Sequence, residues 1–176
     1  MIRYIACDPD TKDSAYAVIC EQGKLVDAWI VKSNGLGDCA LKHALHLPTV
    51  EEDVEYRCFV ESQQFYNGDR ADKVKNLLVL ARACGVNMMY VSQHFGEPTL
   101  ILPRKWSKSR KKKENQYWMI TKMGYTPKEA AGYCYAEELL KLFPKTQQKH
   151  LWDAICIAQY AREQQEMKDL ITNNKK

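Results

Sequence analysis

An acidic side chain closes the first apolar run of this chain. Residues 2–8 read Ile-Arg-Tyr-Ile-Ala-Cys-Asp, a short polar turn follows, and a second apolar run begins near Ala15. This pattern predicts a β-hairpin whose first strand ends at Asp8. A carboxylate at the end of a buried strand is costly unless it is paired or binds a cation. Asp8 is therefore a candidate metal ligand.

Two more segments supply groups of the same kind. Glu61 ends the apolar run 58–61, and His150 and Asp153 stand three residues apart, so they would share one face of a helix. If the strands that carry Asp8 and Glu61 are parallel neighbours, both side chains lie at the carboxyl edge of the sheet, where open α/β sheets place their sites. Hard cations such as Mg²⁺ prefer carboxylate oxygens, and two such ions about 3.5–4 Å apart can cleave a phosphodiester. The four residues predict a metal-dependent active site.

Each of the four residues also has an interpretation without chemistry. Asp8 could form a turn, Glu61 could cap or pair at the surface, and His150 could be an ordinary residue at the start of a helix. Asp153 could favour the first turn of a helix through the helix dipole. The joint occurrence of all four at strand ends and on one helical face is what favours an active site.

The spacing of apolar residues predicts the elements that must position these groups. Runs rich in Ile, Val, Tyr and Trp predict five strands, at 2–8, about 15–20, about 25–31, 56–61 and 99–102. The first three form an antiparallel meander with a turn at Gln22-Gly23. The prediction is an α/β fold with a central mixed five-stranded sheet flanked by helices.

Helical spacing is clearest in the middle of the chain. Apolar residues that recur every three or four positions predict one long helix from about 70 to 95. Gly85 lies in its middle, where it costs about 1 kcal/mol relative to Ala, and it could permit close packing against the sheet. The alternative is a break at Gly85, with 88–91 as a strand. The other expected helices lie around 41–46, from about 113 to 123, from Pro127 to before Pro144, and from near Gln147 to about 168.

Length and composition indicate one ordinary domain. With 176 residues the chain can bury a core, and we expect a single domain over 1–168 and a frayed tail over 169–176. Its apolar runs are too short to span a membrane, and the N-terminus does not have the pattern of a signal peptide. Seven scattered cysteines without a Cys-x-x-Cys pair argue against a disulfide framework or a zinc ribbon. We expect a cytoplasmic protein, or one in another reducing intracellular compartment, that is not secreted.

Positive charge is concentrated in one segment after the fifth strand, although the formal net charge is only +4. A basic run is most often a solvated loop. Next to a cluster of acidic metal ligands it suits a polyanionic substrate. Trp106 stands within the run, where we expect it to anchor the loop. The positive residues are Arg104, Lys105, Lys108, Arg110, Lys111, Lys112 and Lys113.

Three motifs follow one another at compatible separations. They are Ile5-Ala-Cys-Asp8-Pro-Asp-Thr with Ala15-Tyr-Ala-Val-Ile19, Phe59-Val-Glu61-Ser-Gln63 with Leu80-Ala-Arg-Ala-Cys-Gly85, and His150-Leu-Trp-Asp153-Ala-Ile-Cys-Ile-Ala158. In this order they resemble the motifs of the RuvC family of Holliday junction resolvases, over roughly residues 2–165. Any one motif is weak, but the three together are fairly specific.

The resemblance implies an RNase H-like fold and a homodimeric endonuclease that depends on Mg²⁺ or Mn²⁺. Such an enzyme would nick two strands of a four-way DNA junction symmetrically, in DNA recombination and repair. Asp8, Glu61, His150 and Asp153 would hold two metal ions per active site. The basic segment would bind the branched DNA.

The chain also departs from the family pattern. Asp10 replaces the usual Gly after the first motif, and Asp13 adds a second charge. Both could assist the metals or face solvent, and we favour solvent, the usual environment of polar turn residues. Phe65 and Tyr66 lie slightly later than the family's aromatic wedge for the junction, so they are candidate DNA contacts or packing residues at the start of a helix. Which of the lysines approaches the scissile phosphate is left open.

Three other functions are compatible with parts of the pattern. A broader RNase H-like nuclease could act on other branched or RNA-containing substrates. A DNA-binding module without catalysis could rely on the basic segment alone. An actin-like phosphotransferase also has an Asp-containing first hairpin, but it would need a second domain and glycine-rich loops, whereas this chain has only eight glycines.

Overall fold

The computed structural model contains the five expected strands. It describes residues 1–62, 71–107, 111–131 and 138–173. Each strand begins within about two residues of its expected start, because alternating or continuous apolar runs bounded by polar turns specify strands well. The strands are β1 (Ile2–Asp8), β2 (Asp13–Cys20), β3 (Leu25–Lys32), β4 (Glu55–Glu61) and β5 (Pro98–Ile101).

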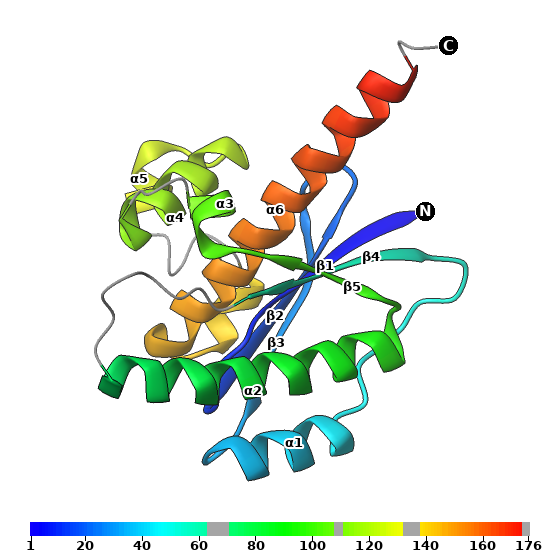
Figure 1. Ribbon diagram of the computed structural model, residues 1–176. Helices are drawn as coiled ribbons and strands as arrows, with labels where there is room; N and C mark the ends of the chain where they lie inside the picture. Colours follow the sequence, from blue (N-terminus) through cyan, green and yellow to red (C-terminus); the bar gives the residue numbers. More distant parts are fainter. Residues whose placement is uncertain (63–70, 108–110, 132–137, 174–176) are drawn as a thin grey trace.

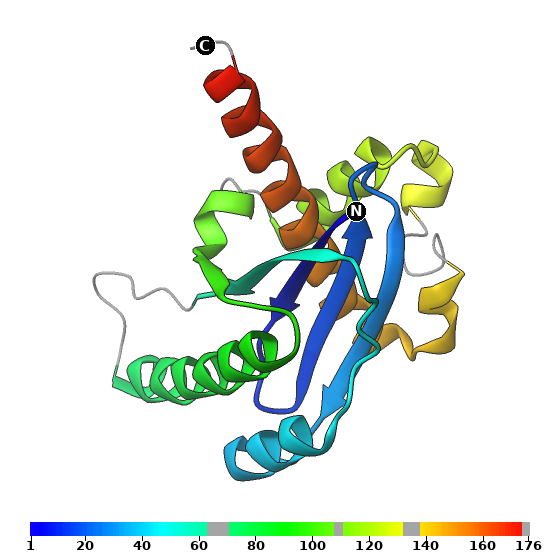
Figure 2. The same ribbon diagram turned by 90° about the vertical axis from the view of Figure 1, so that its right-hand side faces the viewer.

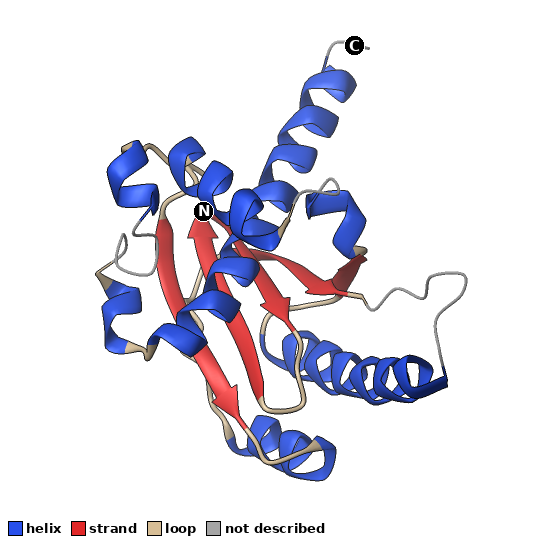
Figure 3. Ribbon diagram, turned by 90° about the vertical axis from the view of Figure 1, so that its left-hand side faces the viewer, coloured by secondary structure: helices blue, strands red, loops and turns tan. Residues whose placement is uncertain are grey.

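The strands form one mixed sheet in the order β3-β2-β1-β4-β5 (Figure 3). β1, β2 and β3 are the expected antiparallel meander. β1 and β4 are parallel neighbours, as are β4 and β5. Asp8 and Glu61 therefore end adjacent strands at the same edge of the sheet.

The helices agree less completely with the predicted ranges. They are α1 (Leu36–Leu45), α2 (Ala71–His94), α3 (Pro103–Ser107), α4 (Lys112–Lys122), α5 (Pro127–Ala131), the 3₁₀ helix η2 (Leu139–Leu142) and α6 (Lys145–Asn173).

The prediction of one long helix from about 70 to 95 is confirmed by α2, and several other helical expectations require correction. α1 begins at Leu36, five residues before the expected start at 41. α2 is one helix, so the break at Gly85 is wrong, and Gly85 is exposed with no atom within 4 Å of the position of its missing Cβ, so close packing does not explain it. One helix was expected from Pro127 to before Pro144. The described residues of this range form two shorter helices, α5 and η2. α3 was not expected, and α6 continues five residues beyond 168, through part of the predicted tail.

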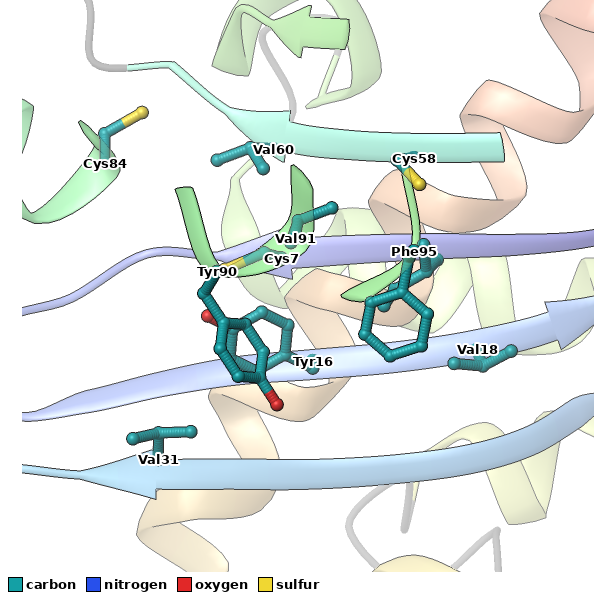
Figure 4. Packing of buried hydrophobic residues seen from close by; sticks show 11 residues of the cluster. Cys7, Tyr16, Val18, Val31, Cys58, Val60, Cys84, Tyr90, Val91 and Phe95 are labelled. Carbon is teal, nitrogen blue, oxygen red and sulfur yellow. The ribbon is translucent and has the colours of Figure 1, made fainter. Parts of the chain in front are cut away.

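α2 covers one face of the sheet with large side chains. Ile5 and Cys7 of β1 point to this face because alternate residues of a strand face opposite sides. They pack with Tyr16 and with Tyr90 and Phe95, which come from α2 and the residue after it (Figure 4). α1 lies beside α2 on the same side of the sheet (Figure 1).

α6 covers the opposite face, which is lined by small side chains. Ala6, Ala15, Ala17 and Ala28 are buried there among residues of α6. The helix contributes further small residues to this contact, namely Ala154, Ala158 and Ala161. Small side chains on both partners let the helix approach the strands closely. The C-terminal part of α6 extends beyond the sheet (Figure 2).

α6 is also fastened to the turn between β2 and β3. The Gln159 amide donates a hydrogen bond to the carbonyl oxygen of Gly23, and the Arg162 guanidinium donates one to the carbonyl of Glu21 at 3.1 Å. Gly23 has φ of 77°, in the left-handed region that favours glycine. A Cβ at this position would lie 2.9 Å from Oε1 of Gln159. The left-handed backbone therefore favours glycine here, and a Cβ would also displace the Gln159 amide that holds the turn.

Cys7, Cys39, Cys58, Cys84 and Cys156 are buried free thiols. Among the described residues, no helix is both long enough and apolar enough to cross a membrane.

We predict opposite effects for alanine at two of the glycines. Gly85→Ala should stabilise the protein by about 0.5–1 kcal/mol, because alanine is the better helix former and the site is open. Gly23→Ala should destabilise it by about 1–2 kcal/mol, because a Cβ strains the left-handed backbone. Denaturant titration followed by circular dichroism measures both. Equal effects at the two sites would contradict this account of the turn.

Candidate active site

Two carboxylates meet where β1 and β4 end. Cys7 and Val60 are register partners in this parallel pair, so Asp8 and Glu61 follow them side by side. Cys7 and Val60 belong to the core on the α2 face. Because side chains alternate, Asp8 and Glu61 point to the other face, where α6 lies. Strand register and the two-residue period together bring these acids to one place.

α6 contributes two further groups to the same edge. Nδ1 of His150 lies 3.2 Å from Oδ2 of Asp8. Asp153, almost one helical turn further along, is 3% exposed. The side chain of Asp8 is 13% exposed, and that of His150 is half-buried. The site is therefore partly open at Asp8 and His150 and closed around Asp153.

Glu61 has a strongly shifted acidity. Its residue is 9% exposed, and its pKa is raised to about 8 by burial, with the negative charges of Asp8 and Asp153 adding to the shift. One interaction acts in the opposite direction: Nε1 of Trp106 donates a hydrogen bond of 2.7 Å to Oε1 of Glu61 and lowers the pKa. Like charges gathered in a poorly solvated place disfavour ionisation. A cation bound there would offset this cost.

Asp153 is held by a side chain from a neighbouring helix. Nε2 of Gln116, in α4, donates a hydrogen bond of 2.6 Å to Oδ1 of Asp153. The same amide nitrogen lies 3.1 Å from the carbonyl oxygen of Lys149 in α6. Gln116 is itself buried. The carboxylate is thus oriented by a neutral donor within the α4–α6 contact.

The structure brings together all four residues that the sequence selected, and it removes two of the simpler interpretations. Glu61 is buried rather than paired at the surface. Asp153 is eight residues after the start of α6 at Lys145, so it does not belong to the first helical turn.

The two extra acids of the first hairpin have local partners. Oδ1 of Asp10 accepts a hydrogen bond from the backbone N–H of Lys12 at 3.0 Å, an arrangement that closes the turn itself. Oδ1 of Asp13 lies 3.4 Å from Nε2 of Gln147, so Asp13 does not simply face solvent.

Sequence reasoning missed two contributions to the site. Trp106 was expected to anchor the loop, and it is buried, but its hydrogen bond to Glu61 could not be read from the basic segment around it. Gln116 carries no signal in sequence beyond its position in a helix. Both residues reach the site only because α3 and α4 fold over the edge of the sheet.

The basic segment is described in part. Arg104 and Lys105 are exposed residues of α3 that directly precede Trp106 in sequence. Lys111 and Lys113 are exposed at the start of α4. The remaining candidate DNA contacts Phe65, Tyr66, Lys108 and Arg110, and the side chain of Lys112, lie outside the described residues.

The donor set suits a hard divalent cation in its chemistry, with three carboxylates and one imidazole. It does not form a closed coordination site as it stands. Among residues 1–62, 71–107, 111–131 and 138–173, no three His, Cys, Asp or Glu side chains are close enough together to hold a metal ion. Glu61 and Asp153 each have one oxygen engaged by a neutral donor.

Comparison with known proteins identifies the fold. No model of a known protein family matches the chain, and no curated protein sequence matches it either. The structure is similar to that of T. thermophilus RuvC in complex with a Holliday junction substrate, with a TM-score of 0.59 and 18% identity over 94% of this chain and 96% of that one. A second T. thermophilus RuvC structure has a TM-score of 0.49 at 18% identity, over 93% and 96% of the two chains. The first match confirms a RuvC-like, RNase H-like fold.

The raised pKa of Glu61 predicts a specific dependence of stability on pH in the metal-free protein. Between its usual pKa of 4.5 and the folded value of about 8, the folded state binds more protons than the unfolded state, so stability falls as pH rises through this window. Glu61→Gln removes the charge and should raise the free energy of unfolding by about 2 kcal/mol at pH 8, and by less at pH 5.

Urea titrations of both proteins in EDTA at the two pH values measure this difference. Glu97→Gln, at an exposed acid outside the candidate site, is the matched control. A gain for Glu61→Gln that is larger at pH 5 than at pH 8 would contradict the electrostatic account.

Proposed function

We propose, on the premise of this RuvC-like fold, that the protein is a structure-selective DNA endonuclease that resolves four-way junctions by symmetric, metal-dependent nicking. The observation that carries the proposal is the meeting of Asp8, Glu61, His150 and Asp153 at one edge of the sheet. These residues come from three distant segments of the chain. Convergence of costly buried acids at one place is typical of a site that binds cations.

Asp8, Glu61, His150 and Asp153 are the residues that would hold Mg²⁺ or Mn²⁺ ions, two per active site. When bound, such ions supply activation of a water molecule and stabilisation of the leaving 3′ oxygen. The protein's own part is positional. Trp106 and Gln116 fix the carboxylates of Glu61 and Asp153 through hydrogen bonds of 2.7 and 2.6 Å. The contact between His150 and Asp8 fixes the imidazole at the open side of the site.

Exposed basic residues support a polyanionic substrate. Arg104 and Lys105 belong to the same short helix as Trp106, whose indole contacts Glu61. Lys111 and Lys113 continue the positive surface at the start of α4. Lysine and arginine on a surface bind the phosphates of DNA largely without regard to sequence. Selection of a branched substrate then depends on geometry rather than on base contacts.

Symmetric nicking of a junction needs two active sites related by a two-fold axis, and hence a homodimer. An exposed apolar surface is available for this on α1 and α2. Leu41 and Leu45 of α1 and Met89 of α2 are all exposed, and Leu47 follows at 82% exposure. Between the helices lies a groove of about 150 Å³, which is mainly apolar but includes His43 and Gln93 in its lining. Its other lining residues are Ala40 and Ala44 of α1 and Val86, Met89 and Tyr90 of α2. An apolar patch of this kind is typical of a protein–protein interface.

The central test of the function is Asp8→Asn. This substitution should reduce cleavage of a static four-way junction by at least about 10³-fold while leaving junction binding nearly unchanged or slightly tighter, because one negative charge near the phosphates is lost. Gel assays of cutting and binding, with Mg²⁺ and with EDTA, measure the two effects. Thr172→Ala, on the distal end of α6, is the control and should cut normally.

The substrates must be compared in the same experiment. Four-way junctions should be cut in preference to Y-shaped and linear duplex DNA of the same sequence. Equal cutting of linear duplex would replace junction resolution with a broader nuclease activity. Absence of cutting by the unmodified protein on every DNA and RNA-containing substrate, with binding retained, would favour a non-catalytic DNA-binding module.

The dimer makes a separate prediction. Leu45→Asp combined with Met89→Asp should convert the protein from dimer to monomer and abolish paired nicks in one junction, because charge is costly in a buried apolar interface. Sedimentation and a cruciform plasmid assay, which separates paired from single nicks, measure both. Leu170→Asp, at an equally exposed leucine on α6, should leave the dimer intact. Dissociation by Leu170→Asp alone would assign the interface to α6 instead.

A further inference from the structure

Three lysines surround a depression on the catalytic edge of the sheet, away from the basic segment. The depression has a volume of about 440 Å³ and is lined by residues of three elements. Lys12 comes from the turn between β1 and β2, Lys32 from the end of β3, and Lys42 from α1. Figure 2 shows this turn beside the end of β3 and α1.

The base of the depression is rigid. The backbone N–H of Ser33 donates a hydrogen bond of 2.7 Å to the carbonyl of Lys12, and the Ser33 hydroxyl donates one of 2.5 Å to the carbonyl of Thr11. The thiol of Cys39, in α1, lies 3.8 Å from the carbonyl oxygen of Asp10. These contacts fasten β3 and α1 to the hairpin turn. The relative positions of the three lysine backbones are therefore set before any ligand arrives.

The acids in the depression are occupied by neutral donors. Asp13 accepts from the amide of Gln147 at 3.4 Å, and Asp38 accepts from the backbone N–H of Asn34 at 2.8 Å. Within the described ranges, none of the three lysines forms an ion pair. All three are exposed. Their charges remain available to an anion from solution.

The depression is also close to the candidate active site. Gln147, which contacts its rim at Asp13, and His150, which contacts Asp8, are three residues apart on α6, or about 4.5 Å along the helix axis. β3 and β5 are the two outermost strands of the sheet. The depression lies beside the end of β3, whereas α3 and the basic segment follow β5 on the other side. Positive surfaces thus lie on both sides of the carboxylates. A nucleic-acid strand across the catalytic edge would contact both.

We propose that this depression binds the sugar-phosphate backbone of the DNA strand that crosses the active site, with Lys12, Lys32 and Lys42 contacting successive phosphates. The inference rests on the proposed function, and it adds the path of the strand on the side away from the basic segment. Phosphates are spaced about 3.4 Å per strand along a duplex axis, so a strand that passes Asp8 reaches the depression within a few nucleotides.

The test uses the full chain with two of the lysines changed. Lys32→Ala with Lys42→Ala should weaken binding of a four-way junction about tenfold at 0.1 M salt. It should also reduce the slope of log affinity against log salt by about 1.8, since each lost phosphate contact contributes about 0.9. Fluorescence anisotropy in EDTA measures both quantities. Lys24→Ala with Lys168→Ala removes the same charge from exposed lysines outside the depression and should change neither.

Two further measurements fix the interpretation. Lys32→Arg with Lys42→Arg keeps the charge and should keep the affinity. Hydroxyl-radical footprinting should lose protection a few nucleotides to one side of the cut site in the alanine pair, and not in the control pair. Identical affinity and salt slope for the alanine pair and the control pair would overturn the inference while leaving junction cleavage by the unmodified protein untouched. Failure of the unmodified protein to bind any DNA would instead overturn the proposed function and this inference together.

Discussion

The close approach of α6 to the sheet is the constraint on which the candidate site depends. Ala6, Ala15 and Ala17 on the strands are buried in the same clusters as Ala154, Ala158 and Ala161 of the helix, among larger side chains of α6. Small residues on both partners favour a close approach of the helix to β1. His150 and Asp153 reach Asp8 and Glu61 only at this separation. Larger side chains on this face would lift the helix and pull the imidazole from its 3.2 Å contact with Asp8. The opposite face, where α2 packs, has bulky aromatic residues and no such role.

The same close packing creates an electrostatic problem that the neighbouring helices relieve only in part. Three carboxylates share an edge with little access to water, and the high pKa of Glu61 reports the cost. The indole of Trp106 and the amide of Gln116 each stabilise one carboxylate without neutralising it. The net negative potential that remains suits a divalent cation. The positive surfaces on either side are then suited to the phosphates that such a cation would act on.

The strands and the acids that end them were predictable from sequence because both obey local rules. An apolar run that ends in an acid marks the end of a strand, and the parallel pairing of β1 and β4 then places Asp8 beside Glu61. Helix ends were less predictable: α3 lies in a run of charges, where the buried Trp106 is the only apolar signal. The donors to Glu61 and Asp153 could not be predicted, because they depend on how α3 and α4 fold over the sheet. The lysine depression was missed for the same reason, since its three lysines are separated in sequence and form no run.

α6 is attached to the sheet near both ends of the strands. Gln147 and His150 contact Asp13 and Asp8 where β1 ends and β2 begins, and Gln159 and Arg162 hold the turn between β2 and β3 at the opposite ends of the strands. The two attachments are about 18 Å apart along the helix. An insertion or deletion of one residue between them would rotate one attachment relative to the other by about 100° around the helix axis. The two attachments could then not form at the same time. Later residues of α6 still contact the body of the protein, because Glu163 pairs with Lys122 and Asp169 lies 3.7 Å from Arg57. Changes in length are therefore best tolerated after Asp169, whereas the helical segment from 147 to 162 must keep its length.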